Sequence, residues 1–182
     1  MRALVTTAAK RMELRSVDEP QPGEREVLLQ VSATGLCGSD YHLYLGDHPL
    51  ARFPMVQGHE LCGVVRELGP SCAGDHEIGA QVCVEPLLPC GDCYPCRLGR
   101  YNCCTRLEIV GVHRPGGLQE AIAVPERLLW SSEGLGPAGP TFAEPRVVLP
   151  HCSRGTDGGA GAASHAQVRI DLDVVAIGGD RL

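Results

Sequence analysis

The sequence predicts a mainly β domain, a barrel or a sandwich, from which a small cysteine-rich lobe projects. Short segments rich in Val, Ile and Leu recur through residues 1–130, and Gly, Pro or acidic residues separate them. This part of the sequence has no apolar pattern typical of a helix of ordinary length. Between residues 86 and 106 cysteines replace the strand pattern, which indicates a separate compact lobe.

The expected elements follow one another in a simple order. An opening hairpin begins with the strand Ala3–Thr7, and Pro20 and Pro22-Gly23 separate it from the next strand. Gly38-Ser39-Asp40 is expected to provide the N-cap of a single helical turn, Tyr41–Leu45. The remaining strands are expected at Glu26–Ser32, Glu60–Glu67, Gln81–Glu85 and Gln119–Val124. Aromatic residues make up only 4% of the chain, so the core must consist mainly of aliphatic side chains.

Composition excludes several classes of protein. The 182 residues are 43% hydrophobic and 21% charged, as in a soluble globular domain. A net charge of -6 argues against a nucleic-acid or anionic-membrane surface. The N-terminus lacks the pattern of a signal peptide, and no apolar run approaches the roughly 20 residues that span a bilayer. We therefore expect a cytoplasmic protein with reduced thiols, in which a dense cysteine cluster binds metal more often than it forms disulfides.

The cysteine-rich lobe carries the strongest local motif. Cys90, Cys93 and Cys96 form two successive C-x2-C steps, and either Cys103 or Cys104 supplies a fourth sulfur. Four thiolates that converge in a tight turn suit a closed, structural zinc site, which would fold a lobe too small for a hydrophobic core. Uncoordinated thiols or a C-x-x-C redox pair are the alternatives. Iron–sulfur ligation is a further one, although the spacing differs from ferredoxin patterns.

A second, scattered set of residues also contains metal ligands. Cys37 precedes Ser39 and His42 closely, and His59 and Glu60 follow about twenty residues later. A mixed set of Cys, His and Glu with one open position is what a catalytic zinc requires. Taken alone, however, a cysteine in a turn and a His-Glu pair are more often structural.

The motifs C-G-S-D-x-H, G-H-E and C-x2-C-x2-C-x7-C, in this order, resemble the zinc-dependent medium-chain dehydrogenases. The resemblance runs from residue 1 to about residue 145. It implies a GroES-like β-barrel catalytic domain over residues 1–130, with the zinc lobe at 86–106, one structural zinc and one catalytic zinc. It also implies that the N-x-C pattern at residues 102–104 makes Cys104, rather than Cys103, the fourth ligand of the lobe.

The same resemblance implies the ligands of the catalytic zinc. Cys37 and His59 match ligands of the family, and Glu60 matches an acidic residue that binds zinc directly or alternates with water. Glu144 lies in a Glu-Pro element that resembles the one supplying another ligand in the polyol and threonine branches. Asp40 is expected to orient a zinc-binding histidine rather than to react.

The implied activity is oxidation of an alcohol with NAD(P)+. Zinc would lower the pKa of a substrate hydroxyl. Ser39 is placed to accept its proton and His42 to pass it on; the alternative is that Ser39 or Asp40 only caps the helix. Glu144 makes the sugar-acid and polyol branch the most similar, so the expected partner is a small alcohol, polyol or sugar acid. A homo-oligomer, as in the family, is a further expectation.

The resemblance decays beyond residue 145. We expect residues 131–182 to be a divergent segment that ends in a first Rossmann strand at 173–177. No G-x-G-x-x-G turn follows, so a Rossmann domain is expected to be essentially absent, together with its NAD(P) site. Two hypotheses follow. The chain is a truncated enzyme domain, inactive alone, or it is a stand-alone zinc-binding module without catalysis.

Overall fold

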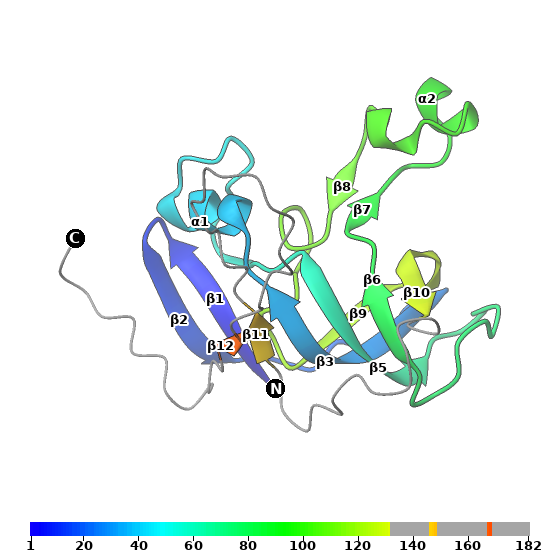
Figure 1. Cartoon of the computed structure of the whole chain (residues 1–182), viewed down its shortest axis with the longest axis horizontal. Coiled ribbons are helices and arrows are strands. Elements are labelled where there is room, and N and C mark those ends of the chain that lie inside the picture. The colour runs from blue at the N-terminus through cyan, green and yellow to red at the C-terminus, as the bar shows by residue number, and fades with distance from the viewer. Residues whose placement is uncertain (132–145, 149–166, 169–182) are drawn as a thin grey trace, which may run out of the picture.

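The computed structural model describes residues 1–131, 146–148 and 167–168. The prediction of a mainly β fold with a small projecting lobe is confirmed (Figure 1). Glu144, a predicted zinc ligand, lies outside the described residues, and so does the Rossmann-like strand expected at residues 173–177. No helix within the described ranges is long and apolar enough to cross a membrane.

A hairpin opens the domain. Strand β1 (Arg2–Ala8) pairs with β2 (Arg11–Ser16), and the short β4 (Met55–Val56) covers its other edge. This small sheet contacts the segment just before residue 121 of the main sheet, where the Leu4 N–H donates to the Leu118 carbonyl at 2.8 Å. An isolated bridge between Ala3 and Gln119 continues the contact, so the two sheets form one wrapped β-body.

The main sheet follows the order β10-β6-β5-β3-β11-β12, and β9 also pairs with β3. Side chains of the central strand, β3, point alternately to the two faces of the sheet. Val27, Leu29 and Val31 therefore all point into one aliphatic core. Each of the four strands predicted for this sheet is present within a few residues of the expected bounds: β3 (Glu26–Gly35), β5 (Glu60–Leu68), β6 (Gln81–Val84) and β9 (Ala121–Pro125). The sheet also contains β10 (Leu129–Ser131), β11 (Arg146–Val148) and β12 (Gln167–Val168), which the sequence did not predict.

The expected start of the first helix was wrong. Helix α1 spans Gly38–Leu45, so Cys37 is the N-cap, and Ser39 and Asp40 lie inside the first turn. The Asp40 side chain points back toward the start of the helix, where its Oδ2 accepts the Cys37 N–H at 3.1 Å. Gly46, with a φ of 80°, adopts the left-handed conformation that ends the helix.

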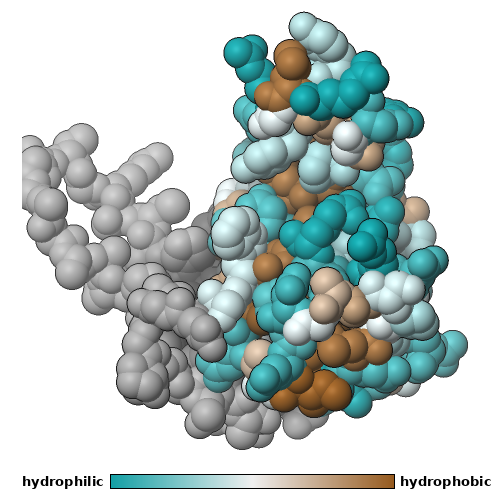
Figure 2. Space-filling model, turned by 90° about the vertical axis from the view of Figure 1, so that its right-hand side faces the viewer, coloured by the Kyte–Doolittle hydropathy of each residue, from teal (hydrophilic) through white to brown (hydrophobic). Residues whose placement is uncertain are grey.

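The lobe stands on a short hairpin that the sequence did not predict, formed by β7 (Leu87–Leu88) and β8 (Glu108–Ile109). Beyond it lie the short helix α2 (Tyr94–Arg97) and a 3-10 turn at Tyr101–Cys103. Figure 2 shows the lobe as a narrow projection with a mostly hydrophilic surface. None of residues 89–109 is buried, so the hydrophobic effect contributes little to holding this segment in shape.

Candidate metal centres

The lobe gathers four sulfur atoms. Those of Cys90, Cys93, Cys96 and Cys104 all lie within 4.8 Å of one another. Cys104 Sγ lies 3.4 Å from Cys90 Sγ and 3.9 Å from Cys93 Sγ, and Cys90 Sγ lies 4.0 Å from Cys96 Sγ. A tetrahedral zinc with Zn–S bonds of about 2.3 Å separates its sulfurs by about 3.8 Å. The four sulfurs therefore fit zinc, whereas Cys103 is exposed and outside the cluster.

Backbone N–H groups favour thiolates in this cluster. The Cys90 N–H points at Cys104 Sγ at 3.3 Å and lowers the pKa of that thiol, and the Arg106 N–H adds to the effect at 3.4 Å. Backbone N–H groups of Cys96 and Thr105 lower the pKa of Cys93 to about 6. Four thiolates this close repel one another, so a divalent cation is needed to ionise them all. The donor set and its hydrogen bonds thus suit a structural zinc.

An ion pair between Asp92 and Arg106 crosses the lobe, and sequence reasoning missed it. Both side chains are exposed, so their attraction contributes little to stability. Opposite charges fourteen residues apart carry no sequence signal for pairing, because the fold of the lobe brings them together.

The second cluster forms where β3 leads into α1 and where β5 begins. Cys37 Sγ lies 3.2 Å from His59 Nε2, and Ser39 Oγ lies 2.8 Å from that sulfur and 3.4 Å from that nitrogen. Zinc bound to both Cys37 and His59 would separate their ligand atoms by about 3.6 Å. The structure therefore brings Cys37, Ser39 and His59 together, and the first and last of these suit a shared zinc ion.

Asp40 belongs to the same group of close metal-ligating residues as Cys37 and His59, but its carboxylate lies on the Nδ1 side of the histidine ring, opposite Cys37 Sγ. Its Oδ1 is 3.4 Å from His59 Nδ1, a long contact, but this buried nitrogen has no hydrogen-bond partner among the described residues. The Asp40 carboxylate raises the pKa of His59 to about 9, although burial acts in the opposite direction. Asp40 and Cys37 use opposite ring nitrogens, so Asp40 is suited to orienting His59 rather than sharing its metal.

Glu60 lies beside the site, opposite Gly35. The two residues lie directly opposite each other in the β3–β5 ladder. Glu60 Oε1 is 3.9 Å from His59 Nε2, but Glu60 is not part of the group of close metal-ligating atoms, which comprises Cys37, Asp40 and His59. A Cβ atom on Gly35 would lie only 2.6 Å from Glu60 Oε2. The glycine therefore leaves the space that the carboxylate occupies.

Closely packed glycines fix the backbone at His59. Gly58 has a φ of 95°, and its carbonyl accepts the Gly117 N–H at 2.7 Å. Cβ atoms on Gly111 or Gly116 would lie within 2.8 Å of Gly58 backbone atoms. The sequence alone does not show why glycine is needed at these positions. The structure shows that the backbone at Gly111 and Gly116 packs against the backbone at Gly58, which leaves no room for a Cβ atom.

His42 is not part of this cluster. Its Nδ1 lies 3.0 Å from Asp47 Oδ1, and 58% of its side chain is exposed. It lies one helical turn after Ser39, on the solvent side of α1. A mostly apolar hollow borders the cluster on another side and is lined in part by Met12, Leu36 and Tyr44.

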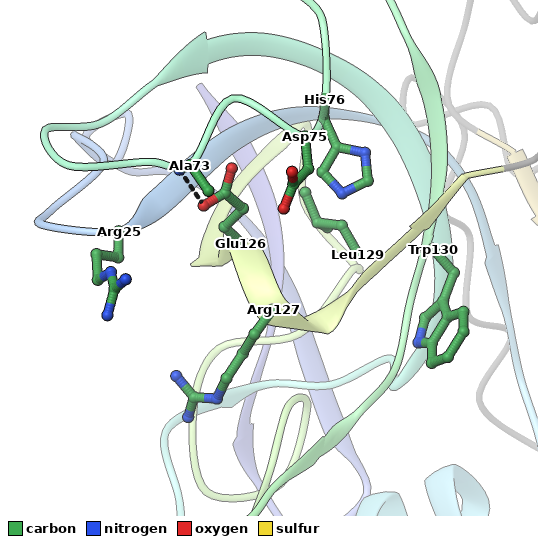
Figure 3. A pocket seen from close by; sticks show the side chains of 8 residues that line it. All are labelled: Arg25, Ala73, Asp75, His76, Glu126, Arg127, Leu129 and Trp130. Atoms are coloured by element: carbon green, nitrogen blue, oxygen red, sulfur yellow. Dashed lines mark hydrogen bonds between the residues drawn. The ribbon is translucent and has the colours of Figure 1, made fainter.

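Another hollow lies at the far end of β5 from His59 (Figure 3). Arg25, His76 and Trp130 line it, and the nearby Glu126 carboxylate accepts the Ala73 N–H at 2.7 Å and the Gly74 N–H at 3.2 Å. These two hydrogen bonds hold the loop at Ala73 and Gly74 against Glu126. Among the described residues, no cluster that could bind a metal ion lies at this hollow.

Replacing Asp40 with Asn is expected to weaken zinc binding at Cys37 and His59 by about 10–100-fold, because the ring loses the charge that orients it. Competition with a chelating zinc indicator measures this affinity. Asp47→Asn is the matched control, since Asp47 contacts His42 and not His59. Equal affinities in the two variants would show that Asp40 does not support the site.

Replacing Gly35 with Ala is expected to displace the Glu60 carboxylate or to cost about 1–3 kcal/mol of stability through overpacking. Gly38→Ala is the control, because a Cβ there meets nothing within 4 Å. Zinc affinity and the free energy of unfolding should both be measured. If Gly35→Ala behaves like Gly38→Ala in both, the contact with Glu60 is unimportant.

Residues 23–133 match the family described as the alcohol dehydrogenase GroES-like domain. The L-galactonate-5-dehydrogenase of Escherichia coli K12 is 34% identical over 154 residues, which are 85% of this chain and 45% of that enzyme. A solved zinc-binding dehydrogenase of Sinorhizobium meliloti 1021, bound to NADP, has a TM-score of 0.67 at 37% identity, covering 71% of this chain and 37% of its own. Galactitol-1-phosphate dehydrogenase from E. coli has a TM-score of 0.67 at 28% identity, covering 72% and 38%.

The chain thus spans less than half the length of these relatives. Zinc-type and NADP-bound relatives make zinc and NAD(P) the cofactors of the family. The family match includes the cysteine lobe and the Cys37–His59 cluster, and the fold agrees with the solved structures. The chain belongs to the zinc-dependent medium-chain dehydrogenases, of which it carries the alcohol dehydrogenase GroES-like domain.

Proposed function

We propose that this chain provides the zinc-binding catalytic domain for NAD(P)-dependent oxidation of a secondary hydroxyl of a polyol or sugar acid. The observation that carries the proposal is the convergence of Cys37 Sγ, Ser39 Oγ and His59 Nε2 within 3.4 Å of one another. A soft ligand, an imidazole and a hydroxyl at one point suit a catalytic metal site with a proton acceptor beside it.

The residues have separate tasks in this proposal. Cys37 and His59 hold zinc, Glu60 binds it or alternates with water, and Glu144 is a proposed fourth ligand from sequence alone. Cys90, Cys93, Cys96 and Cys104 hold the structural zinc. Zinc supplies Lewis acidity that makes a substrate hydroxyl more acidic, and NAD(P)+ supplies the hydride acceptor.

Ser39 receives the proton of the substrate hydroxyl. Its Oγ is beside both metal ligands and lies in the first turn of α1, which holds it in place. We assign to His42 the transfer of this proton to solvent, because its exposed ring lies one turn further along the helix. The two side chains make no direct hydrogen bond, so a bridging hydroxyl or water completes the route.

The substrate class rests on the relatives. One is named for L-galactonate, a sugar acid, and one solved structure for galactitol 1-phosphate, a polyol phosphate. Several others are named for L-threonine, which also carries a secondary hydroxyl. A secondary hydroxyl next to further polar groups is common to all three substrates.

Substitution of cobalt(II) for zinc tests substrate binding without any need for turnover. The visible absorption of a cobalt ion bound by Cys37 is expected to change saturably when a hexonate or hexitol is added, and to change less with ethanol. Cys37→Ala should abolish the response and leave only the bands of cobalt bound by the four lobe cysteines. No response to any polyol or sugar acid would contradict the proposed substrate class.

Reduction of NAD+ or NADP+ tests the hydride step separately. The zinc-loaded chain is incubated with the responding polyol and the absorbance of the reduced nicotinamide is followed. Production of reduced nicotinamide that is lost in Ser39→Ala would support the proposed roles. Substrate binding without reduction would favour the alternative of a zinc-binding module without catalysis in this chain.

A further inference from the structure

Two cysteines outside both metal clusters face each other across the main sheet. Cys62 on β5 and Cys83 on β6 are direct partners in the antiparallel ladder. Directly opposed residues of neighbouring strands project from the same face of a sheet, so the two thiols lie side by side. Neither belongs to a described group of metal-ligating residues.

The hydrogen-bond register makes this pair geometrically suited to a disulfide. The Val65 N–H donates to the Ala80 carbonyl at 3.0 Å, which identifies residues 65 and 80 as a hydrogen-bonded pair. Pairs alternate along an antiparallel ladder, so Cys62 and Cys83 form a non-hydrogen-bonded pair, with Cα atoms about 4.5 Å apart. That spacing lies within the range that disulfides span, of about 4.4–6.8 Å.

The two thiols differ in their access to solvent. Cys83 is exposed and Cys62 is half-buried. The buried residues of β5 and β6, among them Leu61, Val65 and Val82, point to the opposite face and into the core. A small oxidant in solution therefore reaches Cys83 first, without any opening of the core.

We propose that Cys62 and Cys83 form a reversible thiol–disulfide site that reacts with low-molecular-weight disulfides. The Cys83 sulfur attacks the small disulfide, forms a mixed disulfide and releases one thiol. The Cys62 sulfur then attacks the Cys83 sulfur, closes the cross-strand disulfide and releases the second thiol. Two electrons and two protons pass from the protein thiols to the small disulfide, and an excess of small thiol reverses the exchange.

Trp130 provides an internal reporter of this reaction. It is the partner of Cys83 on the other side, in β10, and it is the only tryptophan of the chain. Its indole is 66% exposed, at the edge of the hollow in Figure 3. A disulfide is a stronger quencher of indole fluorescence than a thiol, so oxidation at Cys83 should lower the emission of Trp130.

The test treats the zinc-loaded full chain with oxidised glutathione and maps its peptides under non-reducing conditions. We expect a cross-linked peptide that joins Cys62 to Cys83, release of two reduced glutathione molecules for each cross-link, unchanged zinc content and quenched Trp130. Excess reduced glutathione should reverse all of these changes. Wild-type protein in which Cys62 and Cys83 stay reduced, or carry glutathione separately, would overturn the proposal.

Two variants separate the steps. In Cys62→Ser the mixed disulfide on Cys83 has no resolving thiol, so a stable glutathione adduct is expected at Cys83. Cys103→Ser, which removes another exposed cysteine, should leave the cross-link intact. A cross-link that disappears in Cys103→Ser, or a partner for Cys83 other than Cys62, would contradict the assignment.

Discussion

Replacing Cys93 with Ser is expected to remove one zinc ion from each chain and to unfold the lobe while the β-body stays folded. Four sulfurs surround one point in the lobe, and none of residues 89–109 is buried. Structural zinc contributes about 10–16 kcal/mol of apparent binding energy in small domains, and no hydrophobic core replaces it here. Zinc content should fall from about two to about one ion per chain.

Limited proteolysis and peptide-resolved hydrogen exchange locate the effect. Residues 89–107 should become cleavable and exchange rapidly, whereas β3 and β5 should remain protected. Cys103→Ser is the matched control, because its side chain is exposed and outside the sulfur cluster. Full zinc content in Cys93→Ser would show that the lobe does not bind zinc through these four cysteines.

Replacing Cys37 with Ala is expected to remove the other zinc ion and to leave the lobe intact. Cys37 Sγ lies 3.2 Å from His59 Nε2, so its loss leaves one strong ligand where two converge. Zinc affinity should fall by more than the roughly 10–100-fold expected when a hydrogen-bond partner of a zinc ligand, such as Asp40, is lost. The β-body should keep its stability, because Cys37 is the N-cap of α1 and is not part of the aliphatic core.

Metal analysis of Cys37→Ala should give about one zinc ion per chain, and the lobe should still resist proteolysis. Ser39→Ala is the control, because Ser39 touches Cys37 without being a proposed ligand. It should retain both zinc ions. Loss of both ions from Cys37→Ala would mean that the two sites are not separable.

The sequence predicted which four cysteines come together in the lobe because their spacing is local. Two C-x2-C steps bring sulfurs together in any tight turn, and only the choice between Cys103 and Cys104 needed the family pattern. Cys37 and His59 are 22 residues apart, and they meet only because the ladder of β3 and β5 runs up to Gly35 and Glu60. No spacing in the sequence encodes that pairing.

The misplaced start of α1 has a related cause. Asp40 was expected to precede the helix, yet its carboxylate bonds back to the Cys37 N–H from inside the first turn. An Asp residue suits either position by propensity, so the choice depends on a side-chain contact. The role of Gly35 was missed for the same reason, because it depends on the carboxylate packed over it.

Anomalous diffraction at the zinc edge, from crystals of the zinc-loaded chain, would locate both proposed zinc ions. Two peaks are expected: one at the centre of Cys90, Cys93, Cys96 and Cys104, and one bound by Cys37 Sγ and His59 Nε2. The absence of zinc between Cys37 and His59, or a disulfide within the lobe in place of the first peak, would show that this domain does not hold two distinct zinc ions.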